Sequence, residues 1–188
     1  SDFMKGKIER VCAFRVFDPD RTTNLMDDVV AKIRDGVARS GQKMISEYSA
    51  RMKSLESQRN AKSFNFLSFF ALKEGLALVY EALRSPSAAL GIYDELETLF
   101  GQRNSESWRT HFPSFGGTTL GDDSGSLLDF GKKPYRSLLL ARDLTEFDFR
   151  QYLFARQCQL LFTLGYPAQV LTRGIKFISS FEEALTSN

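Results

Sequence analysis

The sequence predicts an all-α protein, built as an α-solenoid or a tetratricopeptide-like stack of helical hairpins. Along most of its 188 residues, apolar side chains recur every three or four positions, which is the period of an α-helix. Two pairs of these periodic segments are joined by short turns that contain Pro, as in antiparallel helical hairpins. The chain also holds 17 Phe, whose side chains have no polar tip, and this indicates extensive helix packing or a large apolar contact surface.

The N-terminal segment, residues 1–20, is expected to form an arm outside the helical stack. Residues 7–17 are rich in β-branched and aromatic side chains, with charges between them. This pattern is typical of either a short β-strand or an extended segment. Asp18-Pro19-Asp20 predicts the turn that ends it.

A long helix is predicted over residues 24–58. Gly36 and Gly41 weaken its middle and leave a kink or a break there as an alternative. Its apolar residues lie three, four or seven positions apart and so share one face, and they are Met26, Val30, Ile33, Val37, Met44, Tyr48, Met52 and Leu55.

The second predicted helix covers residues 63–83, with Ser63 as its N-cap. It is apolar on nearly all sides and must therefore be covered by neighbours on nearly all sides. Lys73 and Glu74 interrupt the apolar run, so we expect a central core helix and not a membrane span.

A third helix is predicted to begin at Ser85-Pro86, because Ser suits a cap and Pro suits the first helical turn. Gly101 is expected to end it. Its acidic residues Asp94, Glu95 and Glu97 are expected to form a solvated face, since nothing in the pattern predicts a cleft with displaced pKa values.

Residues 101–142 are expected to form a long irregular loop, of the kind that is usually functional or disordered. Three aromatic residues stand out in this polar stretch: Trp108, Phe112 and Phe115. They are candidates for binding another protein, because buried aromatic anchors dominate interface energetics. The alternative is that they fasten the loop to the helices.

No catalytic, cofactor-binding or metal-binding residue is predicted. The only histidine, His111, has no Cys or His at ligand spacing and no nucleophile motif nearby. Residues 115–119 (Phe-Gly-Gly-Thr-Thr) lack the Lys and the strand–helix context of a phosphate-binding loop. Asp122 and Asp123 with Asp129 lack the spacing and the closing Glu of a calcium loop.

The fourth and fifth helices form the second predicted hairpin. Thr145 is expected to cap the fourth helix, which runs to about Leu164. Gly165 ends it and Pro167 begins the fifth. Arg150 and Arg156 lie six residues apart and do not share one narrow stripe, so they are expected to be structural residues, one of them capping or bracing a neighbouring hairpin.

Length and composition predict one soluble helical segment over residues 1–188. The chain is expected to be a fragment of a larger protein. The formal net charge of +2 argues against nucleic-acid partners, which need clustered Lys and Arg. Cys12 and Cys158 form no disulfide framework and indicate a reduced, cytosolic setting. The first ten residues are polar and carry no visible signal peptide.

Two sequence blocks resemble the large TRAPP II-specific subunit family, from the transport protein particle that tethers vesicles. The first block runs from Phe70-Ala71-Leu72-Lys73-Glu74 to the stretch at 93–100 (Tyr-Asp-Glu-Leu-Glu-Thr-Leu-Phe). The second is the stretch at 149–161 (Phe-Arg-Gln-Tyr-Leu-Phe-Ala-Arg-Gln-Cys-Gln-Leu-Leu). The resemblance covers about 63–185, and nothing in it assigns partner contacts to the loop.

The resemblance implies a non-catalytic scaffold segment of a complex that tethers vesicles and promotes nucleotide exchange on Rab-type GTPases in Golgi trafficking. Its implied partners are other TRAPP subunits directly and Rab-type small GTPases indirectly. The implied location is cytoplasmic and peripheral at the Golgi, with membrane association only through the complex. The alternative is a free-standing tetratricopeptide-like peptide-binding module, which needs a groove lined by regularly placed polar residues.

Overall fold

The computed structural model describes residues 19–57, 64–101, 112, 114–116 and 125–186. These residues form six α-helices and no strand, which confirms the all-α prediction. The predicted N-terminal strand or extended segment at 7–17 lies outside the described residues. Contacts divide the chain into two units, Ser1–Lys43 and Met44–Asn188.

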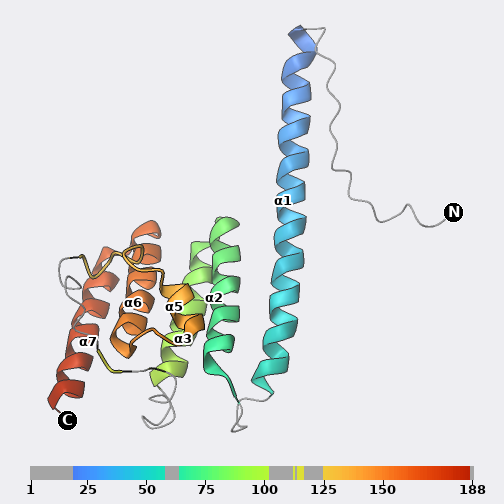
Figure 1. The fold of residues 1–188 in the computed structure, drawn as a ribbon. Helices are drawn as coiled ribbons and strands as arrows, with labels where there is room; N and C mark the ends of the chain where they lie inside the picture. Colours follow the sequence, from blue (N-terminus) through green and yellow to red (C-terminus); the bar gives the residue numbers. More distant parts are fainter. Residues whose placement is uncertain (1–18, 58–63, 102–111, 113, 117–124, 187–188) are drawn as a thin grey trace. The chain divides into compact units, whose positions relative to one another are not determined.

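Helix α1 (Pro19–Glu56) is continuous through both glycines of its middle (Figure 1). It begins at Pro19, so the turn predicted at Asp18-Pro19-Asp20 is wrong from Pro19 onward. Proline fits the first helical position, because the amide hydrogen that it lacks has no intrahelical partner there. The predicted apolar stripe is only partly buried. Met52 is buried and Leu55 packs against the core of the second unit, whereas five residues remain exposed: Met26, Val30, Ile33, Val37 and Met44.

The first hairpin of the second unit consists of α2 (Phe66–Ala82) and α3 (Pro86–Gly101). The N-cap of α2 is Asn65, whose side chain accepts a hydrogen bond from the amide of Ser68 at 3.1 Å, so the prediction of Ser63 as the cap is wrong. The Asn side chain satisfies one of the helix's free amides. Arg84 takes a positive φ of 59° in the turn. As predicted, α2 is buried on most sides.

The second hairpin consists of α6 (Glu146–Thr163) and α7 (Pro167–Thr186). Thr145 caps α6 as predicted, accepting from the amide of Asp148 at 3.1 Å. Gly165 has a φ of 78°, a left-handed conformation that glycine adopts without a steric penalty. This confirms Gly165 as the residue that ends the helix.

A further helix, α5 (Tyr135–Ala141), lies within the segment that was predicted to be irregular. It is short and starts after Pro134. Arg142 closes it in the left-handed conformation, with φ 61°, and the amide of Asp143 donates to the carbonyl of Leu138 at 2.9 Å. This is the hydrogen-bond pattern of a helix C-cap.

Helix α6 is the centre of the second unit. It packs against α3, α5 and α7, while α2 packs against α3 and α5. Figure 1 shows the two hairpins side by side, with α5 beside α2. The core holds a cluster of aromatic rings around Phe149, which is fully buried. Its ring centroid lies 4.8 Å from that of Phe70, 5.1 Å from Phe100 and 5.4 Å from Phe112.

Candidate functional site

Helices α2 and α6 carry buried polar side chains, which is unusual for helices at the centre of a core. The buried polar residues are Lys73, Glu74, Asp148, Gln151, Arg156 and Gln157. A buried charge is tolerated only when it is paired and hydrogen-bonded. The pairing of these groups therefore determines how the hairpins are held together.

Glu74 joins three helices through one carboxylate. It is 1% exposed and accepts hydrogen bonds from Arg136 of α5 and from the hydroxyl of Tyr152 of α6. Burial, with the negative charge of Glu74 as a second cause, raises the pKa of Tyr152. The hydroxyl therefore stays protonated and acts as a donor. Tyr152 also stacks on Tyr135, with ring centroids 5.1 Å apart.

Arg156 joins α6 to the first hairpin. Its Nε donates to the hydroxyl of Tyr93 of α3 at 3.1 Å, and its Nη2 donates to Glu81 of α2. The guanidinium also lies 4.7 Å from the ring centroid of Phe130. Burial raises the pKa of Tyr93 to about 12, although the nearby Arg156 opposes that rise. Arg156 thus bears out the expectation of an arginine that braces a neighbouring hairpin.

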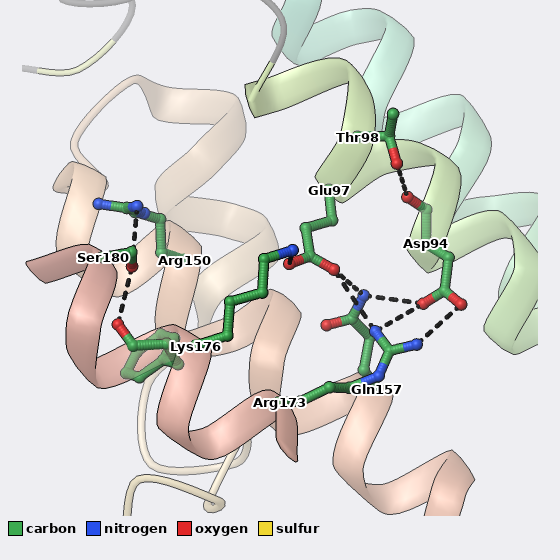
Figure 2. Close-up of polar contacts among 9 residues, drawn as sticks. Asp94, Glu97, Thr98, Arg150, Gln157, Arg173, Lys176 and Ser180 are labelled. Carbon is green, nitrogen blue, oxygen red and sulfur yellow. Dashed lines mark hydrogen bonds and ion pairs between the residues drawn. The ribbon is translucent and has the colours of Figure 1, made fainter. Parts of the chain in front are cut away.

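A second set of polar contacts links α3 to α7 across α6 (Figure 2). Arg173 Nη2 donates to Asp94 Oδ2 at 2.9 Å, and Lys176 Nζ lies 3.4 Å from Glu97 Oε1. Gln157 Nε2 donates to both carboxylates, at 3.0 Å and 2.9 Å. The predicted solvated face is confirmed in part, because the side chains of Asp94 and Glu97 are 40% and 39% exposed, but these acids also bind partners from other helices.

Beside these contacts, α3, α6 and α7 enclose a groove with a volume of about 340 Å³. Apolar side chains line part of it: Phe100, Leu153, Phe154 and Phe177. Arg150 lines it as well, with its guanidinium 4.4 Å from the ring centroid of Phe181 and donating to Ser180 Oγ at 3.1 Å. Burial lowers the pKa of Arg150, against the opposing effect of Glu146. The groove thus offers an apolar lining with a polar rim, which is the usual form of a binding pocket.

The outer face of α7 carries an apolar stripe. Leu171, Ile175 and Ile178 are 69%, 61% and 64% exposed, and their spacing of four and three residues places them on one side of the helix. We call these three residues the α7 stripe.

The three predicted partner-binding aromatics do not form one site among the described residues. Trp108 and His111 lie outside those residues. Phe112 is buried in the core, and Phe115 is half-buried with its ring 5.9 Å from that of Phe181. Partner binding through these aromatics stays a prediction, while the burial of Phe112 favours the alternative of loop attachment.

The segment around Phe115 also completes α6. The carbonyl of Ser114 accepts from the amide of Glu146 at 3.1 Å, and that of Phe115 accepts from the amide of Phe147 at 2.8 Å. These amides belong to the first turn of α6 and have no intrahelical acceptor. The segment therefore caps the helix through its backbone, which no side-chain pattern could reveal.

The described residues contain no group of three His, Cys, Asp or Glu side chains placed to hold a metal ion. Burial raises the pKa of the Cys158 thiol to about 11, so this thiol is protonated near neutral pH. Within the same part of the chain, no helix is long and apolar enough to cross a bilayer.

Comparison with known proteins finds clear relatives, although no family model and no solved structure matches the chain. The chain is 35% identical over 185 residues to the trafficking protein particle complex II-specific subunit 130 homolog of Oryza sativa subsp. japonica, covering 98% of this chain and 14% of that protein. It is 36% identical over 161 residues to the trafficking protein particle complex subunit 10 of Dictyostelium discoideum, covering 84% of this chain and 11% of that protein. It is 30% identical over 198 residues to the trafficking protein particle complex subunit 10 of Homo sapiens, covering 98% of this chain and 15% of that protein.

The chain thus spans about 14% of the length of the relatives that it matches. The matches extend over nearly all of its residues, in plant, amoeba and animal proteins. The chain is therefore homologous, along almost its whole length, to one segment of the large TRAPP II-specific subunits, the family that its two helical blocks resemble.

Proposed function

We propose that this chain is a non-catalytic scaffold segment of a TRAPP II-like complex, which tethers vesicles and acts on Rab-type GTPases in Golgi trafficking. The observation that carries the proposal is its 35% identity, over 98% of its length, to a subunit named for that complex. The chain would contact other subunits of the complex directly and Rab-type GTPases only indirectly. It would associate peripherally with the Golgi, through the complex.

The packing of the second unit supports this role. A scaffold must keep its shape when partners bind to it. The contacts of Glu74 and Arg156 connect four helices, α2, α3, α5 and α6. Sliding one hairpin against the other within the packed core would break these contacts and leave buried polar groups without partners, which is energetically costly. A rigid body with an outward apolar stripe is suited to positioning other subunits.

The proposal is tested by binding. The 188-residue chain is immobilised, after circular dichroism has shown that it is helical, and purified small subunits of the complex are passed over it. We expect at least one subunit to be retained with a dissociation constant in the micromolar range, or tighter, and no change in nucleotide exchange by the chain alone. Retention of none of them by the helical chain would contradict the proposal.

The groove between α3, α6 and α7 favours a second candidate, a tetratricopeptide-like module that binds extended peptides. Its apolar lining and its rim of Arg150 and Lys176 match the mixed lining that such a groove needs. Fluorescence anisotropy with a labelled peptide library tests it. Saturable binding that is lost in a Phe177→Asp variant, while the helical content stays unchanged, would favour the module over the scaffold.

A further inference from the structure

The first unit presents an apolar stripe of its own. Met26, Val30, Ile33 and Val37 of α1 are 54%, 47%, 59% and 54% exposed. They follow one another at intervals of four, three and four residues. This alternation is the heptad spacing of positions d, a, d and a in a coiled coil, where each side chain packs into a facing helix. We call these four residues the α1 seam.

Two exposed charges flank the α1 seam on one side. Asp27 and Arg34 each follow a d position directly and so occupy the e positions of successive heptads. Other charged residues of this helix have an opposite charge four positions away in the sequence, such as Asp28 with Lys32. By contrast, only uncharged residues lie three or four positions from Asp27 and from Arg34. The helix itself therefore offers neither of them an opposite charge at the spacing where helical pairs form.

We propose that the α1 seam binds the α1 seam of a second copy of this chain, with the two helices antiparallel. In the register that fills the seam, Met26 faces Val37 of the partner copy and Val30 faces Ile33 of the partner copy. A two-fold axis then relates the copies, as in most homodimers. The same register places Asp27 beside Arg34 of the partner copy, and the symmetry forms this ion pair twice.

The charges select this arrangement over a parallel one. In an antiparallel pair the e positions of one helix face the e positions of the other, so Asp27 and Arg34 meet. In a parallel pair, e positions face g positions, and g is occupied by the uncharged Val29 and Gly36 in this stretch. The parallel pair would therefore leave both charges without partners. Because the seam covers only about three helical turns, we expect weak association, with a dissociation constant on the order of 100 μM.

Charge reversal tests the proposal in the intact 188-residue chain, by sedimentation equilibrium at several concentrations. Asp27→Arg places Arg opposite Arg twice, and Arg34→Asp places Asp opposite Asp twice, so each variant alone should dimerise at least roughly tenfold more weakly. An equimolar mixture of the two variants should form a heterodimer, because every facing pair then has opposite charges. The double variant should recover the affinity of the original chain.

Asp28→Arg is the matched control, since it makes the same charge change one residue away on the outer side of the helix. It should leave dimerisation within about twofold of the original value. All these positions are exposed, and circular dichroism verifies that each variant remains helical. A chain that stays monomeric at millimolar concentration overturns the proposal. So does a dimer that Asp27→Arg and Asp28→Arg weaken equally, or a mixture that fails to form the heterodimer.

Discussion

Replacing Arg156 by Met should destabilise the second unit more than any other single arginine substitution in the described residues. Arg156 is 6% exposed and holds Tyr93 and Glu81 together. Methionine keeps much of the volume but donates no hydrogen bond. The Tyr93 hydroxyl and the Glu81 carboxylate then stay inside the protein without the donor that compensated their burial.

The burial of Arg156 and Glu81 determines how much stability this substitution removes. Removing one partner of a fully buried ion pair costs about 3–5 kcal/mol. The side chain of Glu81 is 22% exposed, so water can replace part of the lost pairing. We therefore expect Arg156→Met to lower the free energy of unfolding by about 2–4 kcal/mol, a loss reduced at the Glu81 end by solvent screening. Arg39→Met, at an exposed position of α1, should cost less than about 0.5 kcal/mol.

The assay is urea unfolding followed by near-ultraviolet circular dichroism, which reports the packing of the core aromatics. A double-mutant cycle isolates the pair: Arg156→Met with Glu81→Met should cost at least about 1 kcal/mol less than the sum of the two single changes, because the second change removes the orphaned charge. Additive single-variant values, or an Arg156→Met chain as stable as the original, would refute the reasoning.

Three further outcomes follow from the same structure. Asn65→Ala should lower the unfolding free energy by about 1 kcal/mol in the same assay, whereas Asn65→Asp should retain the cap of α2. Burial raises the pKa of Tyr93 from 10.0 to about 12. The protonated Tyr93 therefore contributes its full stability below pH 10, and this contribution is lost as pH rises toward 12. Tyr93→Phe should make the fall of the unfolding free energy over this range less steep, by up to about 1.4 kcal/mol per pH unit. In a Cys12→Ser variant, Ellman's reagent should label Cys158 only at the rate of unfolding, and immediately in urea; fast labelling of the native chain would contradict its burial.

Most of the fold could be predicted from the sequence because its signals are local. The period of apolar residues located five of the six helices, and Thr145, Gly165 and Pro167 marked the boundaries of the second hairpin correctly. Helix α5 was missed because seven residues are too few to show a helical period. Its position depends on tertiary contacts, such as that of Arg136 with Glu74.

The contacts between helices could not be predicted in the same way. Nothing local distinguishes Glu74, which is buried under Tyr152, from a charge that merely interrupts an apolar run. Asp94 and Glu97 look like a solvated helix face until Arg173 approaches from a helix nearly eighty residues later. The exposure of the α7 stripe also could not be predicted from the sequence. Helix α7 has apolar residues on more than one face, and only tertiary packing determines which face is buried.

The most direct test of the scaffold role places one charge in the α7 stripe of the full-length subunit. Ile175 is 61% exposed, so Ile175→Asp should leave the stability of the 188-residue chain within about 0.5 kcal/mol of the original. Gln169→Asp, at an exposed position on another side of α7, is the matched control. We predict that affinity purification of the full-length subunit recovers the other subunits of the complex with Gln169→Asp and loses at least one of them with Ile175→Asp. Full recovery with both variants would contradict the proposal that this segment positions other subunits through its outward apolar stripe.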